Sequence, residues 1–169
     1  MQLVVISGRS GSGKSTALHQ LEDMGYYCVD NLPAALLRQL TQEFLADHYQ
    51  SFTGVAVCID ARNSMRDLEQ ISQQLSSLPE GVDRQVIFLD AHDPVLVKRF
   101  SETRRRHPLS RDDRSLAEAI QVEAKLLEPL LADADLVIDT SDLTLYELCA
   151  MIASRLGEKP GEGLSGLIE

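Results

Sequence analysis

The 169-residue sequence predicts an α/β domain in three layers, with helices on both faces of a parallel sheet. The first observation is a set of short apolar runs that are continuous rather than alternating in polarity, as in strands buried on both faces. The second is that the segments between them are long enough for helices, and strand–helix alternation is typical of parallel sheets. The runs lie at residues 3–7, 26–30, 54–60, 85–90 and 135–139.

Helix-start signals follow several of the expected strands. One helix is expected to begin near Lys14, and another around Pro33, where Asn31 is available as its cap. Farther along, Asp93 has the character of an N-cap, with Pro94 at the first helical position. These signals place a helix directly after three of the expected strands.

Two further helices are indicated by capping boxes at residues 115–118 and 144–147. After the first box, apolar residues recur at helical spacing and predict one helix with a continuous core-facing side. These residues are Leu116, Ile120, Ala124, Leu127 and Leu131.

Composition limits the classes of protein that fit. The sequence is 44% hydrophobic and 25% charged, which is typical of a globular domain. Its formal charge of −10 argues against a surface that binds nucleic acids or anionic membranes nonspecifically. The cysteines (Cys28, Cys58 and Cys149) are widely spaced in apolar surroundings, which indicates buried, reduced thiols. With no basic leader and no run of transmembrane length, a cytoplasmic location is expected.

The domain is expected to cover residues 1–156. Residues 157–169 contain four glycines and a proline, and this composition is typical of a flexible linker that leaves a finished domain. We therefore expect the chain to be the front part of a longer protein.

The most specific motif directly follows the first expected strand. Residues 8–15, GRSGSGKS, match the P-loop pattern G-x-x-x-x-G-K-[ST], with a strand before and a helix after. Glycines let successive backbone N–H groups converge on phosphate oxygens, and the helix directs its positive end to the same place. The motif predicts a P-loop NTPase fold with the kinase-like strand order 2-3-1-4-5. A domain with this fold is expected to bind ATP or GTP with Mg²⁺. The expected ligand contacts come from Gly8, Arg9, Ser10, Gly11, Ser12, Gly13, Lys14 and Ser15.

Within this loop, Lys14 is expected to reach the β and γ phosphates and to support catalysis, while the Ser15 hydroxyl is expected to ligate Mg²⁺. A carboxylate at a neighbouring strand end should hold the metal's water shell. Asp60 is the preferred candidate, because the strand before it would lie beside the P-loop strand, and Asp90 is its rival. Asp30 is a candidate general base, although a turn-forming role fits it equally well.

Cations are concentrated between the fourth and fifth strands. Residues 98–114 hold seven of the 16 lysines and arginines of this acidic chain. We expect a helix here that Pro108 ends, and a lid in which Arg104, Arg105 and Arg106 stabilise charge on the transferring phosphoryl group. Three consecutive arginines cannot share one helical face, so at most two should point at phosphate. The alternatives are a solvated, salt-bridged loop and an RNA-backbone contact.

Several motifs together resemble one family. The segments SGRSGSGKSTAL, LEDMGYYCVDNLP, DARN, FLDA, SETRRRHPL and DLVIDTS are similar, in this order and over nearly the whole chain, to the amino-terminal domain of the RapZ/YvcJ family of RNase adapter proteins. The resemblance implies weak hydrolysis of ATP and GTP, with residues 8–15 as the ATP site. It also implies a GTP segment that consists of Asp60, Ala61, Arg62 and Asn63.

For the full-length protein, the resemblance implies a small RNA and RNase E as partners, and regulation of small-RNA processing and amino-sugar synthesis. The family's carboxy-terminal RNA-binding domain has no counterpart in these 169 residues. Three functions stay open on the residues alone: a regulatory module with slow NTPase activity, a small-molecule kinase, and a scaffold in which the nucleotide is structural. The sequence also leaves open a homo-oligomer.

Overall fold

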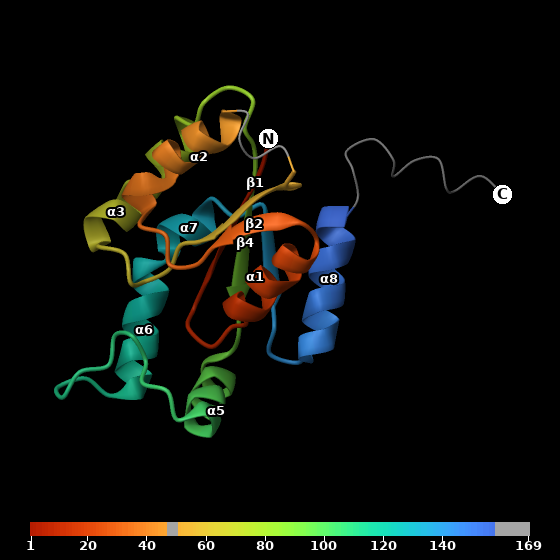
Figure 1. Cartoon of the computed structure of the whole chain (residues 1–169). Helices are drawn as coiled ribbons and strands as arrows, with labels where there is room; N and C mark the ends of the chain where they lie inside the picture. The colour runs from red at the N-terminus through yellow and green to blue at the C-terminus, as the bar shows by residue number, and fades with distance from the viewer. Residues whose placement is uncertain (47–50, 158–169) are drawn as a thin grey trace.

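A computed structural model describes residues 1–46 and 51–157. Its centre is a parallel sheet with the order β2-β3-β1-β4-β5, which confirms the predicted fold class and strand order. Figure 1 shows helices on both sides of this sheet. The strands are β1 (Gln2–Gly8), β2 (Tyr26–Val29), β3 (Gly54–Cys58), β4 (Asp83–Asp90) and β5 (Leu136–Asp139).

The two faces of the sheet belong to two apolar clusters. Alternate residues of β1 point to opposite faces, so Leu3 and Val5 lie in one cluster and Val4 and Ile6 in the other. The first face is covered by η1 (Ala34–Leu36), α2 (Leu37–Leu45), α3 (Met65–Glu69), α4 (Ile71–Ser76) and α7 (Glu128–Ala132). The second face is covered by α1 (Lys14–Asp23) and α8 (Leu145–Gly157).

Helices α5 (Asp93–Thr103) and α6 (Leu116–Leu126) pack against each other beyond the carboxyl end of the sheet. A smaller apolar cluster that includes Ala91, Leu96 and Ile120 joins them to the end of β4. Because parallel strands place ligand crevices at their carboxyl ends, this helix pair stands next to the expected site.

Several helix boundaries differ from the sequence-based expectation. Helix α5 begins at Asp93 itself, with His92 as its N-cap. It ends at Thr103, because Arg104 adopts a left-handed conformation (φ 52°) and serves as the C-cap. Pro108 therefore does not end this helix, and the three arginines follow the helix rather than forming part of it.

The prediction of a single helix after Ser115 is also wrong. The structure has two helices there, α6 and α7, which are separated at Leu127. Pro129 has no backbone N–H, so it cannot continue the hydrogen-bond ladder of α6. As a result Leu127 is buried, whereas Leu131 is 40% exposed. The capping box of α6 is confirmed: Ser115 Oγ accepts from the Glu118 N–H at 3.2 Å, and a Glu118 carboxylate oxygen accepts from the Ser115 N–H at 3.3 Å.

The second expected box is only half formed, at the start of α8. Thr144 Oγ1 accepts from the Glu147 N–H at 3.1 Å, but the Glu147 carboxylate meets the Thr144 hydroxyl rather than its backbone. Helix α8 continues through Gly157, and the rest of the expected linker lies outside the described residues. Among the helices that the structure describes, none is both long and apolar enough to cross a membrane.

Candidate nucleotide-binding site

The phosphate loop, residues 8–15, connects β1 to α1 at the carboxyl edge of the sheet. Its first glycine is required by packing, because a Cβ atom at Gly8 (φ +146°) would lie 2.1 Å from the Leu89 carbonyl oxygen of β4. Its last glycine, Gly13 (φ +110°), is the left-handed N-cap of α1. The loop is therefore closely fitted between its neighbours, and the helix starts where an anion would be bound.

The start of α1 is electrostatically suited to phosphate. The first turn contains no acidic residue that would neutralise the positive end of the helix. Lys14 folds back over the loop, and its ammonium group donates to the Gly8 carbonyl at 2.7 Å. Ser15 is exposed, and its hydroxyl has no hydrogen-bond partner among the residues in the described ranges. The Ser15 hydroxyl is thus available to a ligand, and the Lys14 ammonium group, which has three donors, keeps two for a ligand while one is used on the loop.

A cavity of about 660 Å³ opens over this loop. It is bounded by the phosphate loop, the ends of β2 and β3, and the segment that follows α5. Several predicted site residues line it together: Ser10, Gly11, Gly13, Lys14, Ser15, Asp60, Arg62, Arg105 and Arg106. Other predicted residues do not line it: Gly8, Arg9, Ser12, Ala61, Asn63 and Arg104.

Arg9 points away from the cavity and anchors the loop to the sheet. Its guanidinium is buried and donates to Asp90 at 2.8 Å, to Asp93 at 2.5 Å and to the Ala91 carbonyl at 2.5 Å. Burial acts to lower the pKa of Arg9, but the hydrogen bonds and charges of the two aspartates raise it overall. Asp90, the rival metal carboxylate, is therefore already paired with a loop residue.

Asp60 is buried at the end of β3, and Arg62 occupies both of its carboxylate oxygens. The Arg62 guanidinium donates to them at distances of 2.7–3.1 Å, and its backbone N–H donates at 2.9 Å. Burial acts to raise the pKa of Asp60, but the hydrogen bonds from Arg62 and the charge of Lys14 lower it overall. Asp30 stands at the end of β2, 3.7 Å from the same guanidinium. The Asp60 carboxylate is thus held ionised beside the phosphate loop.

The donor chemistry of this site suits Mg²⁺. Ser15 offers a hydroxyl, and Asp60 offers an ionised carboxylate that would exchange contacts with Arg62 for the metal or its water shell. Mg²⁺ is usually bound by one or two protein oxygens together with substrate phosphates and water. Within the described part of the chain, no cluster of three or more His, Cys, Asp or Glu side chains could hold a metal by itself. A metal here would accordingly depend on the nucleotide for most of its ligands.

The other two residues of the 60–63 segment support the fold. Ala61 is buried in the apolar core. Asn63 accepts from the Ala34 N–H at 2.7 Å and donates to the Leu32 and Asp60 carbonyls at 3.3 and 3.2 Å. Asn63 thereby supplies a hydrogen-bond acceptor for the first backbone N–H of η1, which is the role expected of Asn31. Asn31 instead has a left-handed backbone (φ 52°).

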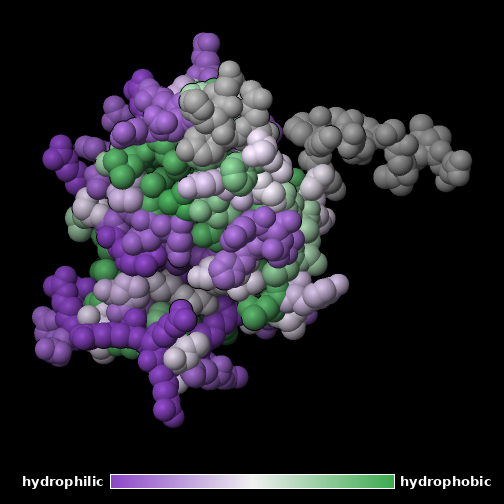
Figure 2. Space-filling view, in the orientation of Figure 1, coloured by the Kyte–Doolittle hydropathy of each residue, from purple (hydrophilic) through white to green (hydrophobic). Residues whose placement is uncertain are grey.

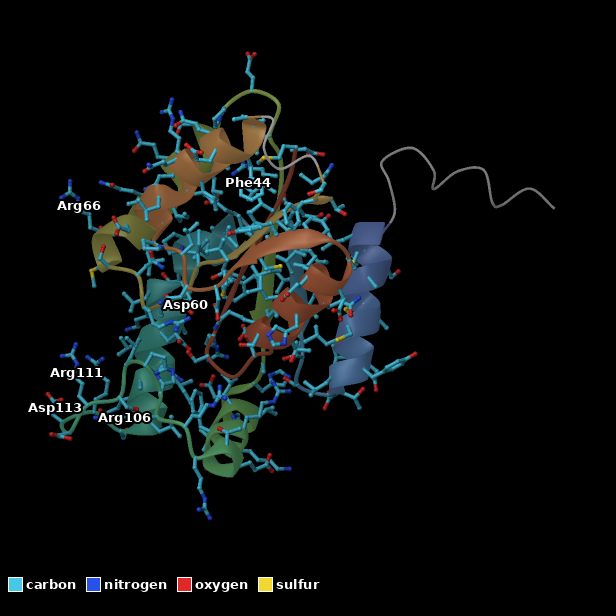
Figure 3. The ribbon with its side chains drawn as sticks, in the orientation of Figure 1. Phe44, Asp60, Arg66, Arg106, Arg111 and Asp113 are labelled. Atoms are coloured by element: carbon cyan, nitrogen blue, oxygen red, sulfur yellow. The ribbon has the colours of Figure 1, made fainter. Side chains whose placement is uncertain are left out.

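The arginine segment, residues 104–106, is exposed at the end of α5. Figure 3 shows Arg106 near the outer end of the molecule with Arg111 and Asp113, while Asp60 lies closer to the sheet. Figure 2 shows hydrophilic side chains covering this end. Arg106 pairs weakly with Asp112, at 3.9 Å and in solvent. Two of the three arginines reach the cavity wall, and Arg104 is the helix cap instead.

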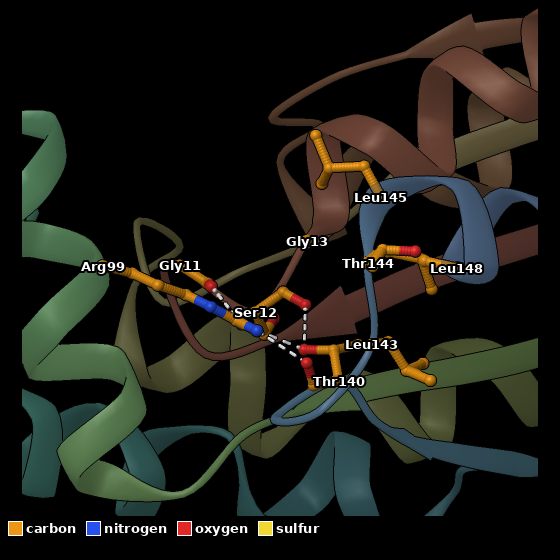
Figure 4. A pocket seen from close by; sticks show the side chains of 9 residues that line it. All are labelled: Gly11, Ser12, Gly13, Arg99, Thr140, Leu143, Thr144, Leu145 and Leu148. Atoms are coloured by element: carbon orange, nitrogen blue, oxygen red, sulfur yellow. Dashed lines mark hydrogen bonds between the residues drawn. The ribbon is translucent and has the colours of Figure 1, made fainter.

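Arg99, one helical turn earlier on α5, is the arginine that contacts the phosphate loop. It donates to the Gly11 carbonyl at 2.9 Å, and to the Thr140 hydroxyl and carbonyl at 3.1 and 2.6 Å. Thr140 follows β5 and donates to the Ser12 carbonyl at 2.6 Å. Figure 4 shows these residues beside a second cavity of about 300 Å³, whose wall also includes Leu143, Leu145 and Leu148.

Sequence reasoning did not assign a role to Arg99, Thr140 or Glu123. Glu123 lies on α6, is fully buried, and accepts from both the backbone N–H and the hydroxyl of Ser10. The available signal was a charged residue on the core-facing side of the helix, three positions after Ile120.

Comparisons with known proteins place these features in a family. A family model described as the RapZ-like N-terminal domain matches residues 1–160. A nucleotide-binding protein of Hahella chejuensis is 52% identical over 164 residues, which cover 96% of this chain and 57% of that protein. A nucleotide-binding protein of Pseudomonas paraeruginosa is 51% identical over 170 residues, covering 100% and 59%. This chain thus spans less than two thirds of the length of these relatives.

Solved structures with the same fold include several kinases. A sugar kinase from Janibacter superposes with a TM-score of 0.60 at 18% identity, covering 93% of this chain and 95% of that one. Shikimate kinase from Acinetobacter baumannii, bound to shikimate, gives 0.56 at 15% identity, covering 93% and 94%. Thymidylate kinase from Candida albicans gives 0.55 at 14%, covering 92% and 91%. At these identities the likeness shows the fold alone.

Proposed function

Because this chain belongs to the RapZ-like N-terminal domain family, we propose that it binds ATP or GTP with Mg²⁺ and hydrolyses the triphosphate slowly. The observation that carries the proposal is the cavity over the phosphate loop, where cations from separate elements line one space. Lys14 comes from α1, Arg62 from the end of β3, and Arg105 and Arg106 from the segment after α5. This distribution of charge suits a polyphosphate.

Each group has a defined role in the proposal. The loop amides and the positive end of α1 hold the phosphates, and Lys14 leaves the Gly8 carbonyl to neutralise the terminal ones. Mg²⁺, held from the side of Ser15 and Asp60, would neutralise charge on the phosphate oxygens. Arg105 and Arg106 contribute positive charge where it accumulates during phosphoryl transfer.

Slow turnover is supported by the state of the carboxylates on the cavity wall. Asp60 is paired with Arg62, and the lowered pKa of its carboxyl makes it a weak proton acceptor. Asp30 is exposed and Glu102 is solvated, so neither is held against a buried reacting group. Positioning of the triphosphate and stabilisation of its charge would therefore supply most of the acceleration of hydrolysis, because no carboxylate on the cavity wall is an effective general base.

The second cavity supports the placement of a purine base next to the phosphates. Its wall combines leucine side chains with the Thr144 hydroxyl and the planar guanidinium of Arg99. Aromatic bases stack well on arginine planes and apolar side chains. These groups are equally compatible with adenine and guanine. Asp60 and Arg62 line the cavity over the phosphate loop rather than this second cavity, so they would not contact a base placed here.

Phosphate release from ATP and GTP, measured with and without Mg²⁺, tests this function. We expect slow release from the wild-type domain and loss of nearly all release in Lys14→Ala at unchanged thermal stability. Release that is the same in both proteins would assign the activity to a contaminant and remove the phosphate loop from the mechanism. Binding by calorimetry without any turnover would instead favour the nucleotide-dependent scaffold.

A second candidate, a small-molecule kinase, is favoured by one observation. Asp30 and Arg62 stand 3.7 Å apart on the cavity wall, where an acidic and a basic group could orient an acceptor hydroxyl. Gluconate, shikimate and thymidine monophosphate are suitable probes, because kinases for such compounds share the fold. Strong acceleration of ADP formation by any of them, abolished in Asp30→Asn, would establish the kinase in place of the slow NTPase.

For the longer protein, we propose that this domain is the nucleotide-responsive part of a cytoplasmic RNase adapter. The sequence resemblance supports a small RNA and RNase E as its partners, and assembly as a homo-oligomer. The isolated domain should bind the small RNA at least tenfold more weakly than the full-length protein, because its net charge is −10. Equal affinity would place RNA recognition in these 169 residues.

A further inference from the structure

A buried carboxylate on α6 lies at the junction of the phosphate loop and the chain that follows α5. Glu123 is 0% exposed, and its carboxylate accepts from the Ser10 N–H at 2.7 Å and from the Ser10 hydroxyl at 2.6 Å. The same carboxylate meets His107 Nε2 at 3.2 Å. Ser10 is itself part of the cavity wall, whereas Glu123 does not line the cavity, so Glu123 contacts the site through Ser10.

The tautomer of His107 follows from its other nitrogen. Nδ1 accepts from the Leu109 N–H at 3.0 Å, so Nε2 carries the hydrogen and donates it to Glu123. The imidazole is buried and packs against the Phe100 ring of α5, with the ring centres 5.1 Å apart. His107 directly follows the arginine segment, so the exposed arginines end next to a residue that is bound to Glu123.

The carboxylate is well satisfied in its buried position. A buried charge is strongly destabilising unless several donors meet it, and here Ser10 supplies two and His107 one. Burial acts to raise the pKa of Glu123, but the hydrogen bonds from His107 and Ser10 and the charge of Lys14 lower it overall. A buried, ionised side chain that bridges two segments is suited to fixing their relative position.

We propose that Glu123 is a positioning residue that joins the phosphate loop and the arginine segment into one unit. It holds Ser10 directly, and through His107 it sets where Arg105 and Arg106 stand relative to bound phosphates. The role rests on the proposed function, since it assigns Glu123 to the same nucleotide site. Its removal should reduce turnover more than ground-state binding, because misplacement of charged groups mainly affects the transition state.

Two substitutions separate position from charge. In Glu123→Gln, the amide oxygen can still accept from the Ser10 N–H and from His107, and the amide nitrogen can donate to the Ser10 hydroxyl. In Glu123→Ala, all these links are lost. Glu118→Ala is the matched control, because it removes an exposed acid from the same helix and weakens the cap without touching Ser10 or His107.

Hydrogen exchange measured by mass spectrometry tests the link without any nucleotide. In Glu123→Ala, we expect exchange at least tenfold faster in peptides from both residues 8–14 and 104–110, with Glu123→Gln and Glu118→Ala close to wild type. Faster exchange in only one of the two regions, or in neither, would overturn the proposal. If Glu123→Ala does not fold, Glu123→Asp replaces it, because its shorter side chain withdraws the carboxylate from both Ser10 and His107. Faster exchange is then expected in both regions, and exchange equal to that of wild type would refute the link.

Turnover then tests the consequence of the link. Glu123→Ala should reduce kcat for ATP or GTP roughly tenfold to a hundredfold, with Kd within about threefold of wild type, and Glu123→Gln should restore most of kcat. A kcat for Glu123→Ala equal to that of wild type would refute a positioning role. Wild-type protein without any hydrolysis would refute the proposed function instead, and the exchange result would still decide whether Glu123 joins the two segments.

Discussion

Thr140 offers the most direct test of how the phosphate loop is held. It is 2% exposed, and its hydroxyl donates to the Ser12 carbonyl at 2.6 Å while accepting from Arg99 at 3.1 Å. Thr140→Val keeps the shape and the β-branch but leaves a buried carbonyl of the loop without its donor. Such a group costs about 1–3 kcal/mol of folding free energy. For a chain of this length, that corresponds to a melting temperature lower by about 2–12 °C.

Urea unfolding followed by circular dichroism measures this change, and Thr53→Val is the matched control. The Thr53 hydroxyl also donates to a backbone carbonyl, at 3.1 Å, but in an exposed position where water can replace it. We expect the control to differ from wild type by less than about 0.5 kcal/mol. If both valine variants are equally stable, the loop after β5 does not hold the phosphate loop through this hydroxyl, and the reasoning fails.

Further predictions concern the cations, the loop backbone and a thiol. Arg105→Ala and Arg106→Ala should each lower kcat about tenfold or more with little change in affinity, while Arg104→Ala stays near wild type in the same phosphate-release assay. Gly8→Ala should abolish the cooperative thermal transition, because its Cβ would lie 2.1 Å from a β4 carbonyl oxygen. Burial raises the pKa of the Cys58 thiol to about 12, so iodoacetamide labelling at pH 8 should be roughly a thousandfold slower than for free cysteine and should rise tenfold per pH unit. Labelling at the free-cysteine rate would show that this site opens readily.

The phosphate loop was predictable because its determinants are consecutive. Residues 8–15 carry the backbone requirements, the lysine and the hydroxyl in one stretch, and the apolar runs on either side place it between a strand and a helix. The strand order followed from that motif, and it places β3 beside β1 so that Asp60 comes to the loop. Local pattern was sufficient for this half of the site.

The supports of the loop were not predictable in the same way. Glu123, Thr140 and Arg99 contact loop residues that are 113, 128 and 88 positions away in the sequence. Each contact depends on how α5, α6 and the end of β5 pack, and no local pattern records it. The arginine cluster identified the correct segment, but the left-handed backbone at Arg104 ended the helix early. The arginine that contacts the loop is Arg99, which lies within residues 98–114 but on α5, before the arginine segment.

Calorimetric titration with a nonhydrolysable ATP analogue and with ADP, both with Mg²⁺, tests the central claim most directly. The claim is that Lys14 and the loop amides hold the terminal phosphate of a purine triphosphate. Wild-type protein should bind the triphosphate more tightly than ADP, and Lys14→Ala should remove most of this difference, a loss of about tenfold to a hundredfold in affinity, at unchanged melting temperature. Lys14→Ala that binds the triphosphate as tightly as wild type, or wild-type protein that gives no binding heat with ATP and GTP analogues alike, would contradict it.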